Sequence, residues 1–93
     1  MEIKINEQKV KIVFVDFDNR YDGWFNNKTN EIRLVETANN LKGIIVHELT
    51  HAYLYYYGFS GAELTEELMC NFVEIYAERI IKESERILKW KTK

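Results

Sequence analysis

The stretch TANNLKGIIVHELTHAYLYYY, residues 37–57, decides the fold of this chain. Its apolar residues recur at the spacing of an α-helix, and the motif His47-Glu48-Leu49-Thr50-His51 lies within it. Positions four apart stack on one helix face at about 3.6 residues per turn, so both imidazoles can reach one metal ion. Glu48 then lies beside that ion, where it can take a proton from water. The segment therefore predicts a helix that carries a site typical of zinc hydrolases.

The ends and faces of this helix follow from its flanking residues. We expect an N-cap at Thr37 and an end near Tyr57, because Gly58 suits the left-handed position that follows many helices. Both histidines should point away from the protein core. The opposite face, which should pack on a sheet, is formed by Leu41, Ile45, Leu49, Ala52 and Tyr56.

The first third of the chain predicts strands. Residues 1–5 and 10–17 are separated by a possible turn at Asn6-Glu7-Gln8, and the longer segment is rich in β-branched and aromatic residues. A second hairpin is expected from Trp24-Phe25 and residues 31–35, which flank an asparagine-rich turn. We therefore expect a three- or four-stranded antiparallel sheet within residues 1–36, covered on one face by helices.

A second helix is expected within residues 62–89. Two starts are open, a capping box at residues 60–63 and an N-cap at Thr65, of which Thr65 is favoured because Glu66 and Glu67 follow it. The helix should run to about Leu88. Its buried stripe should comprise Leu68, Phe72, either Ile75 or Tyr76, and Ile80. Residues 1–93 then form one α+β domain.

Composition excludes several classes of function. The net charge is −2, from 13 basic and 15 acidic residues that are well mixed along the chain, so we expect no nucleic-acid partner. One cysteine, no signal-peptide pattern and no long apolar run predict a cytoplasmic protein that does not enter a membrane. An apolar strip near the end, Ile87, Leu88 and Trp90, allows a weak homodimer; otherwise we expect a monomer.

Catalytic zinc sites usually have three protein ligands, and the chain has no third histidine. Glu67 is the expected third ligand, because it lies 16 residues past His51, which is enough chain for an antiparallel second helix to return across the histidines. Asn71, one turn further, can accept a hydrogen bond from a ligating imidazole and fix its orientation. Glu63, Glu66 and Cys70 are less favoured, and Cys70 is more simply a small buried residue.

These residues resemble the short zinc metallopeptidases of the gluzincin kind, in particular the ImmA/IrrE-like family and its small relatives in phages and mobile elements. The likeness lies in the motif at residues 47–51, the segment Glu67-Leu68-Met69-Cys70-Asn71-Phe72, and the hairpin at residues 23–34. It spans about residues 21–80. The resemblance implies a minimal zincin-like domain over residues 1–93. It also implies that Glu67 is the third zinc ligand and that Asn71 supports a ligand from outside the coordination sphere. Family members are usually longer, with a further helix before the sheet and often a DNA-binding or regulatory region.

A complete site of this kind predicts a peptidase. Zinc lowers the pKa of water towards about 7, and Glu48 can accept its proton and return it to the leaving amine. A further donor should stabilise the tetrahedral intermediate, and Tyr55, four residues beyond His51, is the first choice. The strand at residues 31–35, if it forms the sheet edge nearest the metal, can pair with a peptide substrate. Other possible donors are Tyr53, Tyr56, Tyr57 and Tyr76.

Simpler interpretations exist for each feature. The histidines can be ordinary surface residues, Glu67 can stabilise a helix start without metal, and the tyrosines can be packing residues. A non-catalytic zinc domain that binds a partner protein is the main alternative function. Glu48 favours the enzyme, because a structural zinc site does not need a general base.

Overall fold

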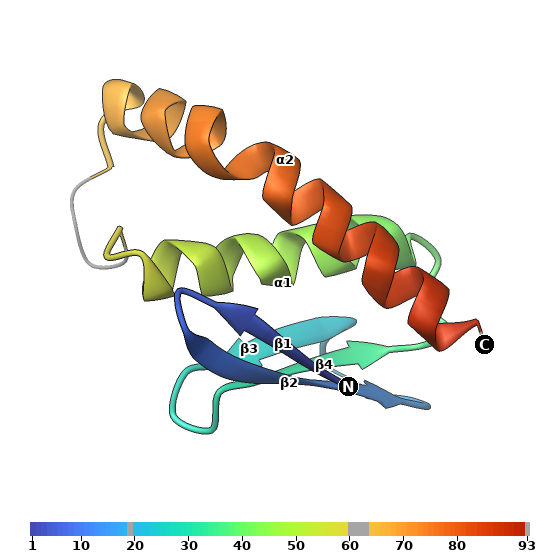
Figure 1. The fold of residues 1–93 in the computed structure, drawn as a ribbon. Coiled ribbons are helices and arrows are strands. Elements are labelled where there is room, and N and C mark those ends of the chain that lie inside the picture. The colour runs from blue at the N-terminus through green and yellow to red at the C-terminus, as the bar shows by residue number, and fades with distance from the viewer. Residues whose placement is uncertain (19, 60–63, 93) are drawn as a thin grey trace.

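The computed structural model describes residues 1–18, 20–59 and 64–92. They form an α+β fold, as the sequence predicts: a four-stranded sheet is followed by two helices (Figure 1). The helix α1 (Leu41–Tyr56) lies on one face of the sheet, and α2 (Glu66–Lys91) packs across α1 on the side away from the sheet. Neither of these two helices is long and apolar enough to cross a membrane. The strands are β1 (Glu2–Ile5), β2 (Gln8–Val15), β3 (Gly23–Asn26) and β4 (Glu31–Val35).

The sheet is mixed, whereas the sequence predicted antiparallel pairing throughout. The strand order is β1-β2-β4-β3, and the central pair β2 and β4 is parallel. In β4, Ile32, Leu34 and Val35 are buried, whereas every residue of β3 keeps some exposure. We attribute the order to this difference, because the central position buries more apolar surface than the edge. The loop after β2 therefore carries the chain to the far edge, and β4 returns beside β2.

Two turns define the hairpins. Asn6 and Glu7 adopt positive φ angles of 48° and 67° between β1 and β2, which suits a tight two-residue turn. Asn6 also ties this turn to the end of α1, because its Nδ2 donates a 2.8 Å hydrogen bond to the Tyr56 carbonyl. In the second turn, Asn26 Oδ1 accepts a hydrogen bond from the Lys28 amide at 2.9 Å. The expected asparagine-rich turn is therefore present.

Helix α1 begins three residues later than the expected start after Thr37. Thr37 does not cap the helix, because its hydroxyl donates to the Asp16 carbonyl just after β2. The N-cap is instead Asn40, whose side chain accepts a hydrogen bond from the Gly43 amide at 3.3 Å. The other end agrees with the prediction. Gly58 has a φ of 83°, and the Phe59 amide donates to the Leu54 carbonyl at 2.8 Å, which closes a Schellman motif.

Helix α2 has the N-cap predicted at Thr65, whose hydroxyl accepts from the Leu68 amide, and it extends to Lys91, beyond the expected end. The alternative start at residues 60–63 lies outside the described residues. Tyr76, not Ile75, belongs to the buried stripe, since Ile75 is 55% exposed. The core contains Ile45, Leu49 and Ala52 from α1, Phe72, Ile80 and Ile87 from α2, and Ile3, Ile5, Val10, Ile12, Ile32 and Leu34 from the sheet.

Candidate metal and catalytic site

The two histidines of the motif converge on one point. They lie on the exposed side of α1, one turn apart, with their ring centroids 4.8 Å from each other. The Nε2 atoms of His47 and His51 are separated by 3.2 Å. Such a distance permits one N–H···N hydrogen bond when one ring donates. It is also the separation expected of two ligands of a shared ion.

The chemistry and spacing of this pair fit zinc. Two nitrogens that bind a tetrahedral zinc ion at about 2.0 Å lie about 3.3 Å from each other, close to the observed 3.2 Å. Both nitrogens belong to exposed side chains, so an ion can approach them from solvent. His47 and His51 can therefore provide two ligands without rearrangement.

Glu48 differs from the histidines in its burial. Only 6% of this residue is exposed, although His47 and His51 on the same turn of the helix are both exposed. Burial raises the pKa of the Glu48 carboxyl above its ordinary value of 4.5, while the charges of His47 and His51 act in the opposite direction. A carboxylate with a raised pKa is a stronger base, which suits a group that must accept a proton.

The motif opens into a cavity of about 430 Å³ between α1 and β3. A second cavity of about 360 Å³ adjoins it and shares Tyr21, Gly23, His47 and Glu48 with it. The two together form a groove along the outer edge of the sheet, and His47 and Glu48, which line both cavities, lie at its middle. Tyr21, Trp24, Phe25 and Asn27 complete the larger cavity from the strand side.

Gly23 allows this close approach of β3 to α1. A Cβ atom at this position would lie 2.9 Å from Ile44 Cγ2 and 3.2 Å from both Glu48 Cγ and the Arg33 carbonyl oxygen. Such contacts are tighter than side chains normally tolerate. The absence of a side chain at Gly23 therefore sets the distance between the strand and the carboxylate.

Tyr55 is brought into the site as predicted from its spacing. It is 41% exposed, lines the larger cavity with the two histidines and packs edge-on against Phe25. The other tyrosines proposed as donors lie elsewhere. Tyr53, Tyr57 and Tyr76 contact one another where α1 meets α2, and Tyr56 donates its hydroxyl to Asn30.

Glu67 does not form a group with the histidines, and neither Glu67 nor Asn71 lines the cavities beside them. Both residues are exposed on the first turns of α2. They lie on the same face of the helix as Glu78 and Lys82, whose side chains are 79% and 73% exposed, so this face points to solvent. Within residues 1–18, 20–59 and 64–92, no group of three or more His, Cys, Asp or Glu residues is close enough to hold a metal. Cys70 is exposed and not buried as expected, and Glu63 lies outside the described residues. The third ligand therefore stays a prediction.

Sequence reasoning missed the strand side of the site. Tyr21 and Gly23 line both cavities, but neither was singled out. The one available signal was the glycine that opens a short aromatic strand, because an isolated glycine in a strand often marks a close approach of other groups. Tyr21 lies in the loop before β3 and has no pattern that could have identified it.

Comparison of the chain with protein-family models, curated proteins and solved structures gives no match.

Proposed function

We propose that this protein is a zinc-dependent peptidase. The observation that carries the proposal is the 3.2 Å separation of the His47 and His51 Nε2 atoms beside the buried carboxyl of Glu48, in a groove along a sheet edge. Paired imidazoles and a neighbouring base are the parts that metal-assisted hydrolysis of a peptide needs. The resemblance to ImmA/IrrE-like metallopeptidases supports the same reaction. The same resemblance also supports a regulatory protein as the substrate.

Each residue has a defined role in this proposal. His47 and His51 hold zinc through Nε2. When bound, the ion would polarise a carbonyl and lower the pKa of water towards about 7. Glu48 accepts a proton from the attacking water at a carboxylate oxygen and gives it to the leaving amine. Tyr55 donates its hydroxyl to the substrate carbonyl oxygen as negative charge develops there.

The substrate backbone is proposed to pair with β3. The sequence had suggested residues 31–35 for this role, but β4 is an interior strand and β3 is the edge. Because the Asp22 carbonyl accepts from the Val35 amide at 2.8 Å, alternation along the ladder directs the backbone of Gly23 and Phe25 to the free edge. Both residues line the groove, so an extended peptide can pair there beside the histidines.

Glu67 is proposed as the third ligand on sequence grounds. To reach the histidines, the first turns of α2 must rotate or shift toward α1. The uncovered apolar residues of this part of the helix are consistent with such freedom, since Met69 is 38% and Val73 is 52% exposed.

Cys70, the single cysteine, is free and exposed, which is consistent with a proposed reducing, cytoplasmic location.

Metal content is the first test. Native mass spectrometry of the untagged protein should show one zinc ion, lost in His51→Ala and bound more weakly in Glu67→Ala. A mixture of fluorescence-quenched extended peptides should then be cleaved by the wild type with zinc, and Glu48→Gln should bind zinc normally but lose cleavage by about a hundredfold or more. Wild-type protein that binds no zinc, or a Glu48→Gln variant that cleaves normally, contradicts the proposal.

A non-catalytic zinc domain is the second candidate, because only two ligands meet in the described part of the chain. In that case zinc stabilises the fold and Glu48 has no chemical role. Peptide cleavage separates the two: in a non-catalytic domain, removal of zinc by a chelator would still lower the Tm of wild type and Glu48→Gln, but neither protein would cleave any peptide.

A further inference from the structure

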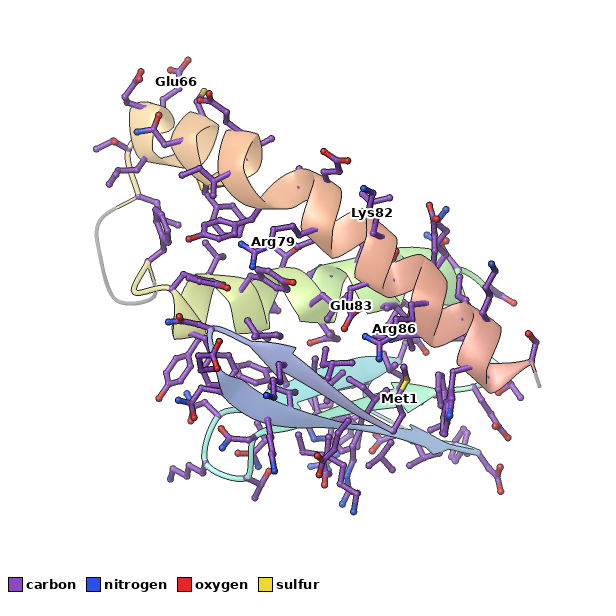
Figure 2. The ribbon with its side chains drawn as sticks, in the orientation of Figure 1. Met1, Glu66, Arg79, Lys82, Glu83 and Arg86 are labelled. Atoms are coloured by element: carbon purple, nitrogen blue, oxygen red, sulfur yellow. The ribbon has the colours of Figure 1, made fainter. Side chains whose placement is uncertain are left out.

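A second groove lies at the opposite edge of the sheet from the histidines. It has a volume of about 640 Å³ and runs between β1, the other edge strand, and α2. Figure 2 shows Glu83 and Arg86 extending from α2 toward the strands across this groove. Because β1 and β3 are the two ends of the strand order, this groove is separate from the proposed active site.

The groove gathers positive charge although the whole chain has a net charge of −2. Five basic residues line it, Lys4, Lys9, Arg79, Lys82 and Arg86, against two acidic residues, Glu2 and Glu83. Arg86 is paired with Glu83 at 3.1 Å, and Lys82 is paired with Glu78 at 2.9 Å. The described residues provide no carboxylate within salt-bridge distance of Lys4, Lys9 or Arg79.

The arrangement of the two lysines is unfavourable for the isolated protein. Lys4 and Lys9 are direct cross-strand partners in the first hairpin, and both are exposed. Like charges directly opposite each other destabilise an antiparallel pair. An acidic ligand along the free edge of β1 would relieve this repulsion. Arg79 is held in place nearby, because it donates to the Tyr57 hydroxyl and lies over the Tyr57 and Tyr76 rings.

The groove also contains unpaired backbone groups. The Met1 carbonyl accepts from the Ile12 amide at 2.8 Å, so the backbone of Met1, Ile3 and Ile5 faces β2. Alternation then directs the N–H and C=O groups of Glu2 and Lys4 outward, and both residues line the groove. A row of free donors and acceptors on an edge strand is a template for a further strand.

We propose that this groove binds an extended acidic peptide segment of a partner protein. The peptide adds a strand to the free edge of β1 through Glu2 and Lys4, and its carboxylates lie against Lys4, Lys9 and Arg79. Neither zinc nor the histidines take part, so the proposal does not depend on the peptidase activity.

Two other occupants fit less well. A nucleic acid would satisfy the cations, but it offers no alternating amide and carbonyl groups for the edge of β1. A second copy of the chain, paired through the same edge, would bring two sets of unpaired lysines together. Both occupants can be distinguished from a peptide in the experiment below.

The test uses a fluorescein-labelled peptide of about ten residues in which pairs of Glu alternate with pairs of Thr, so that an extended strand presents carboxylates on both of its faces. Binding to the full chain is measured by fluorescence anisotropy and located by NMR. We expect saturable binding that shifts the amide signals of Glu2 and Lys4 and not those of Gly23 and Phe25. Lys4→Glu and Lys9→Glu should each raise the Kd roughly fivefold. Lys28→Glu, a charge reversal in the exposed turn before β4, should leave the Kd within about twofold of wild type.

These variants separate loss of binding from loss of folding. Lys4→Glu places opposite charges across from each other in the hairpin, so its Tm should be unchanged or higher.

A peptide with Gln in place of Glu, and one N-methylated at alternate residues, should both bind at least about fivefold more weakly. Equal binding of the N-methylated peptide would exclude strand addition. Tighter binding of an oligothymidylate, or a protein dimer that the peptide cannot dissociate, would also overturn the proposal.

Discussion

Gly23 is the residue on which the geometry of the proposed site depends most directly. Its missing side chain lets the edge strand β3 approach α1 where Glu48 is buried. Glu48 is the group that must be kept from water if its basicity is to stay high. A single position on the strand therefore controls both packing and the environment of the proposed base.

Gly23→Ala should lower the free energy of unfolding by about 1–3 kcal/mol, because the new Cβ would lie 2.9 Å from Ile44 Cγ2 and backbone would have to shift. Urea denaturation measures this loss, and NMR of the folded variant should show displaced signals for Ile44 and Glu48. Gly58→Ala is the matched control. It should cost about 1 kcal/mol through its positive φ of 83°, but it should leave the Glu48 signals unchanged. Equal stability of Gly23→Ala and wild type would contradict this account.

At the scale of the element, α2 packs tightly only along part of its length. Its second half buries Ile80, Ser84 and Ile87 against the rest of the protein. In its first half only Phe72 is buried. No residue of the segment 66–71 before it is buried, and both Met69 and Val73 are exposed although they continue the same helical stripe. The first turns of α2 are therefore less firmly held, and they contain the predicted third ligand.

Neighbouring isoleucines on α2 test this description of its packing. Ile80 is 4% exposed and Ile81 is 41% exposed, so the same substitution removes core contacts at one position and mainly surface contacts at the next. Ile80→Ala should lower the free energy of unfolding by about 2–4 kcal/mol, and Ile81→Ala by less than about 1 kcal/mol. Chemical denaturation of both variants provides the comparison. Similar losses would mean that α2 is rotated relative to the described packing.

At the scale of the whole molecule, one buried and one partly buried tyrosine link folding to pH. Burial raises the pKa of Tyr53 and of Tyr56 above the ordinary value of 10.0. Between that value and the raised pKa, the unfolded chain loses protons that the folded protein keeps. The free energy of unfolding is therefore constant with respect to these groups below pH 10.0 and falls as pH rises through the raised pKa.

Replacement of Tyr53 should make the protein less sensitive to alkali. Tyr53→Phe keeps the aromatic contacts with Tyr57 and Tyr76 but removes the hydroxyl, so the fall in stability above pH 10.0 should be shallower by up to about 1.4 kcal/mol per pH unit. Urea denaturation at a series of alkaline pH values measures the slope. Tyr21→Phe, at a residue that is 58% exposed, is the control and should keep the wild-type slope. An unchanged slope in Tyr53→Phe would contradict the burial argument.

Local chemistry explains what could be predicted about the elements. The helix with the histidine motif, the Thr65 cap, the left-handed Gly58 and the asparagine turns depend on residues close in sequence, and the structure contains each of them. Thr37 was a wrong N-cap because a local rule cannot show that its hydroxyl bonds to Asp16, which is 21 residues away.

The residues of the candidate site also fall into two groups, those that local spacing could predict and those that it could not. His47, Glu48, His51 and Tyr55 share one helix, so spacing alone could place them together, and the structure does so. Glu67 belongs to another helix, and its distance from the histidines depends on how that helix is rotated and tilted. The basic groove could not be foreseen either, because its cations come from two strands and a helix and appear well mixed in the sequence.

The sequence by itself determined the elements, their order and the convergence of the two imidazoles, because the 3.6-residue period of a helix is a local property of the chain. Only the tertiary structure decided that β4 pairs in parallel with β2, that β3 and β1 are the two free edges, and that each edge borders a groove. The physical reason is that strand order and helix rotation are set by burial of the whole apolar surface. Contacts between distant residues contribute to that burial, and no local segment encodes them.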